Sequence, residues 1–242
     1  MVIDDRQLFN RVIRLYVSEN LAKVIYMLRK TFTRLSNCLM VIENMIGIID
    51  YHLNNLRSVQ KAFEKVGVDS FISDNAAELR KADKLVLPGV GAFGQAMQNL
   101  HSLGLDEVVK EHAASGKYLL GICLGMQLLF TKSYELGEFN GLNLVNGEVK
   151  IFPSTVKVPH MGWNQVEIVR QSSILNCVEE NSFVYFVHSY FVEPKENVTL
   201  TQTEYGFKFT SIIEQKNIFG IQFHPEKSQT TGLQLLKNFS KL

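Results

Sequence analysis

Gly121-Ile122-Cys123-Leu124-Gly125-Met126-Gln127 places a cysteine between two glycines, where one kind of segment gives way to another. Residues 117–120 have the apolar character of a buried strand, and residues 126–130 have the composition of a helix start. Cys123 is therefore expected at a sharp strand-to-helix turn, because small residues two positions before and after it let the backbone bend. Unpaired N–H groups at the start of the helix would stabilise a thiolate there.

A second segment, Gly220-Ile221-Gln222-Phe223-His224-Pro225-Glu226, supplies partners for this cysteine. Most free cysteines are small buried hydrophobes, so Cys123 alone would not indicate catalysis. Side chains two positions apart on an extended chain point to the same side, so Glu226 can hold the His224 imidazole in one orientation. The other ring nitrogen can then take the thiol proton. The sequence predicts a catalytic triad of Cys123, His224 and Glu226.

A third segment has the composition of an oxyanion-binding loop. Residues 85–88 form an apolar strand that runs into Pro88-Gly89-Val90-Gly91-Ala92-Phe93. Backbone N–H groups of Val90 or Gly91, together with that of Leu124, are expected to bind the oxyanion of a tetrahedral intermediate. Proline and glycine after a strand are otherwise signals of an ordinary turn, so this interpretation depends on the cysteine.

Taken together, these segments resemble the class I, triad-type glutamine amidotransferases. Val158-Pro159-His160-Met161-Gly162-Trp163-Asn164 and Tyr185-Phe186-Val187-His188-Ser189-Tyr190 narrow the resemblance to the glutaminase-subunit family of imidazole glycerol phosphate synthase, from about residue 45 to the C-terminus. The resemblance implies that Cys123 attacks the side-chain amide of glutamine and releases ammonia through a thioester. It also implies a cyclase subunit as partner in a heterodimer that serves histidine biosynthesis in the cytoplasm.

The same resemblance assigns further residues to two groups. Those expected to bind glutamine are Gly91, Gln127, Glu135, His188, Ser189 and Tyr190. Those expected at the partner face are His160, Trp163 and Lys227. Structural interpretations stay open for several of them: Gln127 could cap a helix, Tyr190 could pack in the core and Glu135 could be a solvated charge. Trp163 is expected in a loop, where a tryptophan can anchor an interface.

Composition agrees with one soluble domain and excludes several classes of protein. The 242 residues are 46% hydrophobic and 20% charged, with a formal net charge of +1 that gives no case for nucleic-acid or membrane binding. The three cysteines show no disulfide or zinc spacing, and no apolar stretch approaches the roughly 20 residues of a membrane helix. No metal, nucleotide or flavin motif is present, so no cofactor is expected.

The order of the predicted elements indicates an α/β fold. Strands around residues 46–51, 71–72, 84–87 and 117–120 alternate with helices expected over 56–65, 76–81, 94–100 and 106–115. This rhythm favours a largely parallel sheet with helices on both faces, and the resemblance implies a flavodoxin-like arrangement. The later half, 141–220, is expected to add antiparallel strands. The site is then expected at the carboxyl ends of the central strands.

Two features depart from the family pattern. Residues 1–44 precede the amidotransferase domain expected over 45–242, and their apolar positions recur at near-helical spacing. They are either a helical extension or the product of a translation start placed too far upstream of Met45. The turn His52-Leu53-Asn54 stands where many relatives carry glycines, although Asn54 tolerates a left-handed backbone.

Three other functions remain open on the sequence. A paralogous amidotransferase could supply ammonia to another acceptor, such as a surface-polysaccharide sugar, and the altered turn at residues 52–54 is the only reason to consider it. A catalytically silent binding module would not need Cys123, His224 and Glu226 together. A cysteine peptidase would share the triad but not the segments at residues 158–164 and 185–190.

Overall fold

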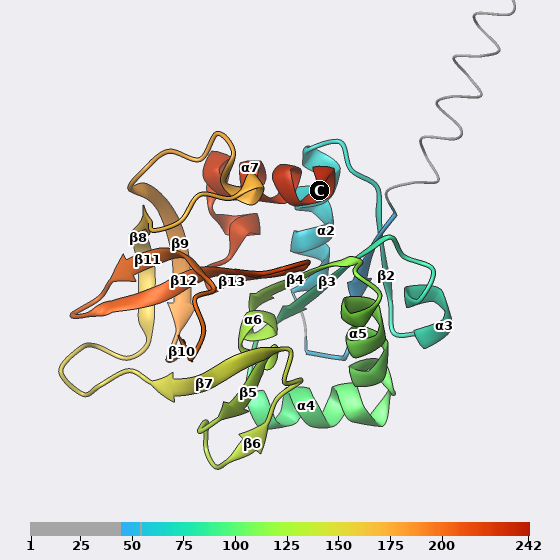
Figure 1. Cartoon of the computed structure of the whole chain (residues 1–242), viewed down its shortest axis with the longest axis horizontal. Helices are drawn as coiled ribbons and strands as arrows, with labels where there is room; N and C mark the ends of the chain where they lie inside the picture. The colour runs from blue at the N-terminus through green and yellow to red at the C-terminus, as the bar shows by residue number, and fades with distance from the viewer. Residues whose placement is uncertain (1–44, 54) are drawn as a thin grey trace, which may run out of the picture. The chain divides into compact units, whose positions relative to one another are not determined.

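The computed structural model describes residues 45–53 and 55–242, which form two sheets with helices packed around the larger one (Figure 1). The larger sheet has nine strands in the order β2-β1-β3-β4-β13-β12-β11-β8-β9, and the smaller has the order β10-β7-β5-β6. The predictions for residues 1–44 and for Asn54 lie outside the described residues.

One half of the large sheet is parallel and contains the strand that ends at the cysteine. Its strands β2, β1, β3, β4 and β13 all pair in parallel, which confirms the predicted parallel sheet. Their bounds are β1 Ile46–Ile49, β2 Ser70–Ser73, β3 Lys84–Gly89, β4 Tyr118–Cys123 and β13 Ile218–Ile221. Because β4 has neighbours on both sides, it is buried and its carboxyl end is fixed in position.

The antiparallel strands expected in the later half are present. They continue the large sheet from β13 as β12 Lys208–Gln215, β11 Thr199–Glu204, β8 His160–Ile168 and β9 Ser182–His188. The smaller sheet contains β5 Phe130–Ser133, β6 Phe139–Asn140, β7 Val145–Ile151 and β10 Tyr190–Pro194. Only one residue, Ser189, separates His188 at the end of β9 from Tyr190 at the start of β10, so the chain passes directly from one sheet to the other.

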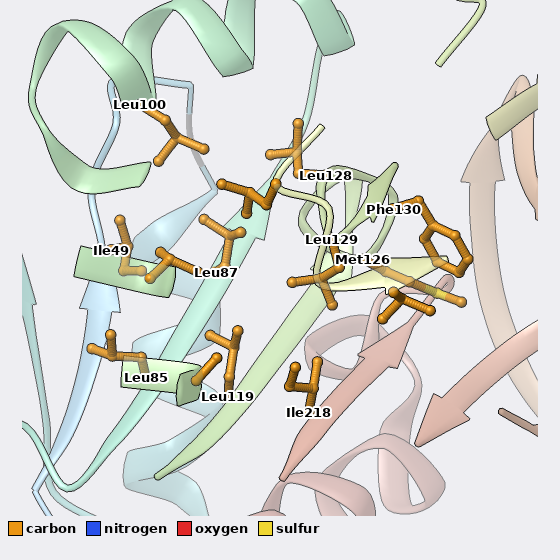
Figure 2. Close-up of a cluster of buried hydrophobic side chains, with 14 of the residues drawn as sticks. Ile49, Leu85, Leu87, Leu100, Leu119, Met126, Leu128, Leu129, Phe130 and Ile218 are labelled. Carbon is orange, nitrogen blue, oxygen red and sulfur yellow. The ribbon is translucent and has the colours of Figure 1, made fainter. Parts of the chain in front are cut away.

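Helices cover both faces of the parallel strands, as the sequence predicted. They are α2 Leu56–Lys65, α3 Ala76–Leu79, α4 Phe93–Ser102, α5 Leu105–Ala114, α6 Leu124–Leu128 and α7 Gln229–Lys241, with 3₁₀ turns at Ser173–Leu175 and Pro225–Lys227. Side chains of a strand alternate between its faces, so Val86 packs in the core beneath α2 and α7. Leu85 and Leu87 point to the opposite core, where Leu100 of α4 also lies (Figure 2).

Two local expectations are wrong. The helix predicted over residues 126–130 ends at Leu128, and Phe130 begins β5, because the Leu128 and Leu129 carbonyls accept hydrogen bonds from the segment before β7. Trp163 lies inside β8 rather than in a loop. The pairing of β8 with β9 runs without interruption from His160 to Val166, which keeps the segment extended despite its proline and glycine neighbours.

The turn at Cys123 requires glycine on both sides for reasons of space. A Cβ atom on Gly125 would lie 1.7 Å from the Leu87 carbonyl oxygen, and one on Gly121 would lie 2.7 Å from the Gly125 oxygen. These contacts are with backbone, which cannot move aside as a flexible side chain can. The first turn of α6 is therefore packed directly on β3 and β4.

Gly125→Ala is expected to lower the free energy of unfolding by about 2–4 kcal/mol, because β3 and α6 must separate to admit a methyl group. Urea denaturation measures the effect. Gly67→Ala is the matched control, since Gly67 has a φ of +77° but nothing within 4 Å of an added Cβ, so only backbone strain of about 1 kcal/mol applies. Equal losses in the two variants would contradict the close-approach argument.

Candidate active site

Cys123 lies at the carboxyl end of β4 in a backbone conformation that few residues adopt. Its φ is 54° and its ψ is −110°, and it immediately precedes α6. Positive φ in a residue other than glycine costs free energy, and such strain is common where a side chain must be presented for chemistry. Cys123 is 6% exposed and lines a cavity.

The predicted histidine and glutamate form a buried pair beside the cysteine. His224 Nδ1 lies 2.9 Å from Glu226 Oε1, and their side chains are 3% and 1% exposed. The same carboxylate oxygen accepts a hydrogen bond of 3.0 Å from Asn55 Nδ2. His224 Nε2 makes no hydrogen bond with any described residue, so it is available to the Cys123 thiol or to a substrate.

The charges of this group favour a protonated imidazole. Burial by itself would lower the pKa of His224, but the Cys123 sulfur and the Glu226 carboxylate outweigh it and raise that pKa to about 10. The structure therefore favours an imidazolium at His224, between the Cys123 sulfur and the Glu226 carboxylate. In this charge state the histidine can donate a proton to a leaving group.

A cavity of about 360 Å³ opens in front of Cys123 and collects nearly all the predicted site residues. Its lining consists of Val90, Gly91, Cys123, Leu124, Gln127, Glu135, Pro159, Val187, His188, Ser189, Tyr190 and His224. Of the residues predicted for catalysis, the oxyanion hole or glutamine binding, only Glu226 is outside this lining, because it stands behind His224. The backbone N–H groups of Val90 and Gly91 make no hydrogen bond with another described residue.

Glu135 supplies a negative charge to the cavity. Its Oε2 accepts a hydrogen bond of 2.7 Å from the N–H of Phe93, the first residue of α4. Burial raises the pKa of Glu135, and the Phe93 N–H opposes that shift. A half-buried carboxylate without a cation among its described contacts is suited to receive one from a ligand. The solvated-charge interpretation therefore does not fit this position.

Gln127 is a bridge between strands rather than a helix cap. Its Nε2 donates to the Tyr190 carbonyl oxygen at 3.0 Å and to Gln222 Oε1 at 3.2 Å. Gln222 is fully buried, and its Nε2 lies 4.0 Å from Cys123 Sγ. Both hydrogens of the Gln127 amide are thus engaged, which fixes the amide in one orientation with its oxygen left for a ligand.

An exposed apolar surface on β8 and β9 adjoins the cavity, and we call it the β8–β9 face. It contains Met161, Trp163 and Phe183, which are 64%, 47% and 56% exposed, together with Tyr185. Trp163 and Tyr185 meet edge to face at 6.0 Å, and Lys227 Nζ lies 5.9 Å from the centre of the Tyr185 ring. His160, in contrast, points to the opposite side of β8 and is 3% exposed.

Several residues at this site and on the β8–β9 face were not among the predicted site residues. Asn55 immediately precedes α2, a position where asparagine usually caps the helix, but its side chain makes no capping bond and reaches Glu226 instead. Gln222 offered a signal, because a glutamine inside an apolar strand end must find partners when buried. Phe183 and Tyr185 alternate with buried residues in β9, so the apolar character on both faces of that strand could have indicated a second packing surface.

The comparisons with known proteins agree with this site. The family model described as glutamine amidotransferase class-I matches residues 41–242. The chain belongs to the class I glutamine amidotransferases. Within the class it also belongs to the HisH family, since the imidazole glycerol phosphate synthase subunit HisH of Aquifex aeolicus is 54% identical over 196 residues, covering 80% of this chain and 95% of the relative. The HisH 1 subunit of Campylobacter jejuni strain 81-176 is 48% identical over 201 residues, an alignment that covers 82% of this chain and 100% of the relative.

Solved structures share the fold of this amidotransferase at low sequence identity. PurLQS from Thermotoga maritima aligns with a TM-score of 0.65 at 17% identity, covering 81% of this chain and 97% of that one. Another glutamine amidotransferase gives the same TM-score at 15% identity and covers 99% of that chain. Among the described residues of the amidotransferase, no helix is both long and apolar enough to cross a membrane, and no three His, Cys, Asp or Glu side chains are grouped to hold a metal ion.

His224→Gln is expected to slow alkylation of Cys123 by iodoacetamide at pH 7 about tenfold, because the imidazolium that stabilises the thiolate is lost. Peptide mass spectrometry of the full chain follows the rate at each cysteine. Cys177 is exposed and serves as the internal control, with the same rate in both proteins. An unchanged rate at Cys123 would mean that His224 does not act on the thiol.

Proposed function

We propose that this chain is the glutaminase subunit of an imidazole glycerol phosphate synthase and that residues 45–242 form its amidotransferase domain. One observation carries the chemistry: a cysteine in a strained strand-to-helix turn shares a cavity with a buried histidine–glutamate pair. The names of the HisH relatives support the assignment to this synthase. The reaction is the hydrolysis of glutamine to glutamate and ammonia.

The first half of the reaction forms a thioester. Cys123 Sγ attacks the side-chain amide carbon of glutamine, and the carbonyl oxygen takes the negative charge. The N–H groups of Val90, Gly91 and Leu124 are the proposed donors to that oxyanion. His224, protonated at Nε2, gives its proton to the departing amide nitrogen, so ammonia leaves and the acyl group stays on sulfur.

The second half returns the enzyme to its starting state. Neutral His224 takes a proton from a water molecule, which attacks the thioester carbon. The tetrahedral intermediate then expels the Cys123 thiolate and leaves glutamate. Glu226 keeps the imidazole in one orientation throughout and stabilises its charged form, while Asn55 holds the carboxylate in place.

Substrate binding follows from the charges of the cavity. The Glu135 carboxylate is suited to the α-ammonium group of glutamine, and the free oxygen of Gln127 can accept from the substrate as well. Gly91, His188, Ser189 and Tyr190 complete the proposed pocket wall. No cofactor is required, because the nucleophile, acid and base are all side chains.

The β8–β9 face is the proposed docking surface for the cyclase subunit. Exposed aromatic and methionine side chains are typical of interface centres, and Lys227 adds a charge at the rim. This face borders the cavity through Val187 and Pro159, so ammonia released at Cys123 would leave close to the partner. A thiolate nucleophile suits a reducing compartment, and we place the heterodimer in the cytoplasm.

A different acceptor enzyme is the alternative that the turn at residues 52–54 motivated. In the structure His52 has a φ of 66° and lies 3.5 Å from Asp74, with both side chains exposed. Neither the backbone angle nor the contact with Asp74 favours another acceptor. Glutamate release measured with and without the histidine-pathway cyclase and its nucleotide ligand separates the two, since only the proposed partner should raise the rate.

Cys123→Ala is expected to abolish glutamine-dependent formation of imidazole glycerol phosphate by the complex, because no thioester can form. Synthesis from added ammonium chloride should be unchanged, since the cyclase reaction does not use this sulfur. Product formation is measured with each nitrogen source in turn. Loss of both activities would point to a structural role for Cys123, and retention of both would remove it from the mechanism.

Trp163→Ala is expected to weaken binding of the cyclase subunit about thirtyfold or more, as removal of a central aromatic anchor does at other interfaces. Isothermal titration calorimetry gives the dissociation constant. Tyr134→Ala is the matched control, because Tyr134 is 44% exposed, close to the 47% of Trp163, but does not belong to the β8–β9 face. Equal losses in both variants would overturn the assignment of this face.

A further inference from the structure

A row of hydrogen bonds on the buried side of β8 begins beneath the exposed Trp163. Asn164 Nδ2 lies 3.3 Å from His160 Nε2, His160 Nδ1 lies 3.1 Å from His188 Nε2, and His188 Nδ1 lies 2.8 Å from the Tyr190 carbonyl oxygen. The three side chains thus connect β8 to the point where the chain leaves β9 for β10. Tyr190 lies on the wall of the cavity.

The ends of this row determine the direction of every bond. A carbonyl oxygen only accepts, so His188 must carry its proton on Nδ1 and present a bare Nε2. His160 must then donate from Nδ1, which leaves its Nε2 to accept from the Asn164 amide. Each histidine is therefore held as the same tautomer, with the proton on Nδ1.

The row continues from Tyr190 to the nucleophile. Its carbonyl oxygen also accepts from Gln127 Nε2 at 3.0 Å, and the same nitrogen donates to Gln222 Oε1 at 3.2 Å. Gln222 Nε2 ends the row 4.0 Å from Cys123 Sγ. The Tyr190 carbonyl is thus the junction that receives one donor from the β8 side and one from the Cys123 side.

The two histidines lie in an environment that keeps them neutral. His160 is stacked between Phe186 at 4.7 Å and Tyr205 at 4.0 Å, and both imidazoles are more than 90% buried. Burial lowers the pKa of His160 to about 4. Burial, together with the neighbouring imidazoles of His160 and His224, lowers the pKa of His188 to about 3. At neutral pH the row is therefore made of uncharged groups in fixed orientations.

We propose that Asn164 and His160 are positioning residues that connect the β8–β9 face to the Tyr190 carbonyl and, through it, to Gln127 and the cysteine. Trp163 and Asn164 are adjacent in β8 and point to opposite sides of the sheet, so a partner seated on Trp163 also fixes the strand that carries His160. The coupling rests on the proposed function for the identity of that partner. The hydrogen bonds of the row join residues of this chain and do not depend on that identity.

Two variants test the row while sparing the packing of the ring. His160→Phe keeps an aromatic ring in the stack but removes the donor to His188. His160→Asn places an amide nitrogen near the position of Nδ1 and restores that donor. In the complex with the cyclase and its nucleotide ligand, His160→Phe is expected to lower kcat for glutamine hydrolysis about tenfold, and His160→Asn to recover most of it.

Tyr205→Phe is the matched control. It keeps the ring that stacks on His160 and removes only a hydroxyl that donates to the Lys157 carbonyl at 2.8 Å. This variant is expected to retain the wild-type kcat. Wild-type kcat in His160→Phe would overturn the proposal, whereas wild-type protein that releases no glutamate in the complex would instead overturn the proposed function.

A spectroscopic measurement tests the row in the wild-type chain. In the ¹⁵N-histidine-labelled wild-type chain at pH 7, His160 and His188 are both expected to show the neutral tautomer protonated at Nδ1, assigned by comparison with His160→Asn. Neutral histidines in water favour the other tautomer, so this outcome is specific to the row. A proton on Nε2 of His188 would overturn the proposal even if His160→Phe failed to fold.

Discussion

The close contact between the backbone of Gly125 in α6 and the Leu87 carbonyl of β3 is the constraint on which the site depends. It brings the first turn of α6 onto the parallel strands and holds Cys123 at a φ of 54°. A larger residue at Gly121 or Gly125 would separate the helix from the sheet and move the sulfur away from His224. The strain at Cys123 persists because the two neighbouring strands, β3 and β13, leave β4 no freedom to relax.

The pKa values of two buried histidines shift in opposite directions, although burial by itself lowers both. His224 is close to the Cys123 sulfur and the Glu226 carboxylate, and these two groups favour its protonated form against the cost of desolvation. His188 faces no such charge, and burial keeps it neutral. One imidazole can therefore carry protons while the other acts as a fixed donor and acceptor. The difference between the two pKa values arises from the Cys123 sulfur and the Glu226 carboxylate beside His224 rather than from the depth of burial.

Strands β8 and β9 serve two environments at once. Their outward side chains form an apolar surface beside the cavity, and their inward side chains include the two hydrogen-bonded histidines. A further contact joins this pair of strands to His224, because the Tyr185 carbonyl oxygen accepts a hydrogen bond of 3.0 Å from the backbone N–H of His224. A shift of β9 would therefore move both His224 and Tyr190. The apolar outer surface of β8 and β9 is therefore one hydrogen bond away from the backbone of His224.

The sequence by itself determined that Cys123, His224 and Glu226 lie together, and it also determined the parallel half of the sheet and most of the cavity lining. These features depend on short motifs whose spacing determines their geometry. Only the tertiary structure decided the contacts that span the chain. Asn55 meets Glu226 across 171 residues, and Gln127 meets Gln222 across 95, so no local pattern could pair them. It also decided that Trp163 lies in a strand and that His160 points inward. Both outcomes follow from the pairing of β8 with β9. Residues 158–164 taken alone favour a loop, because strand formation depends on a second segment that the local residues do not specify.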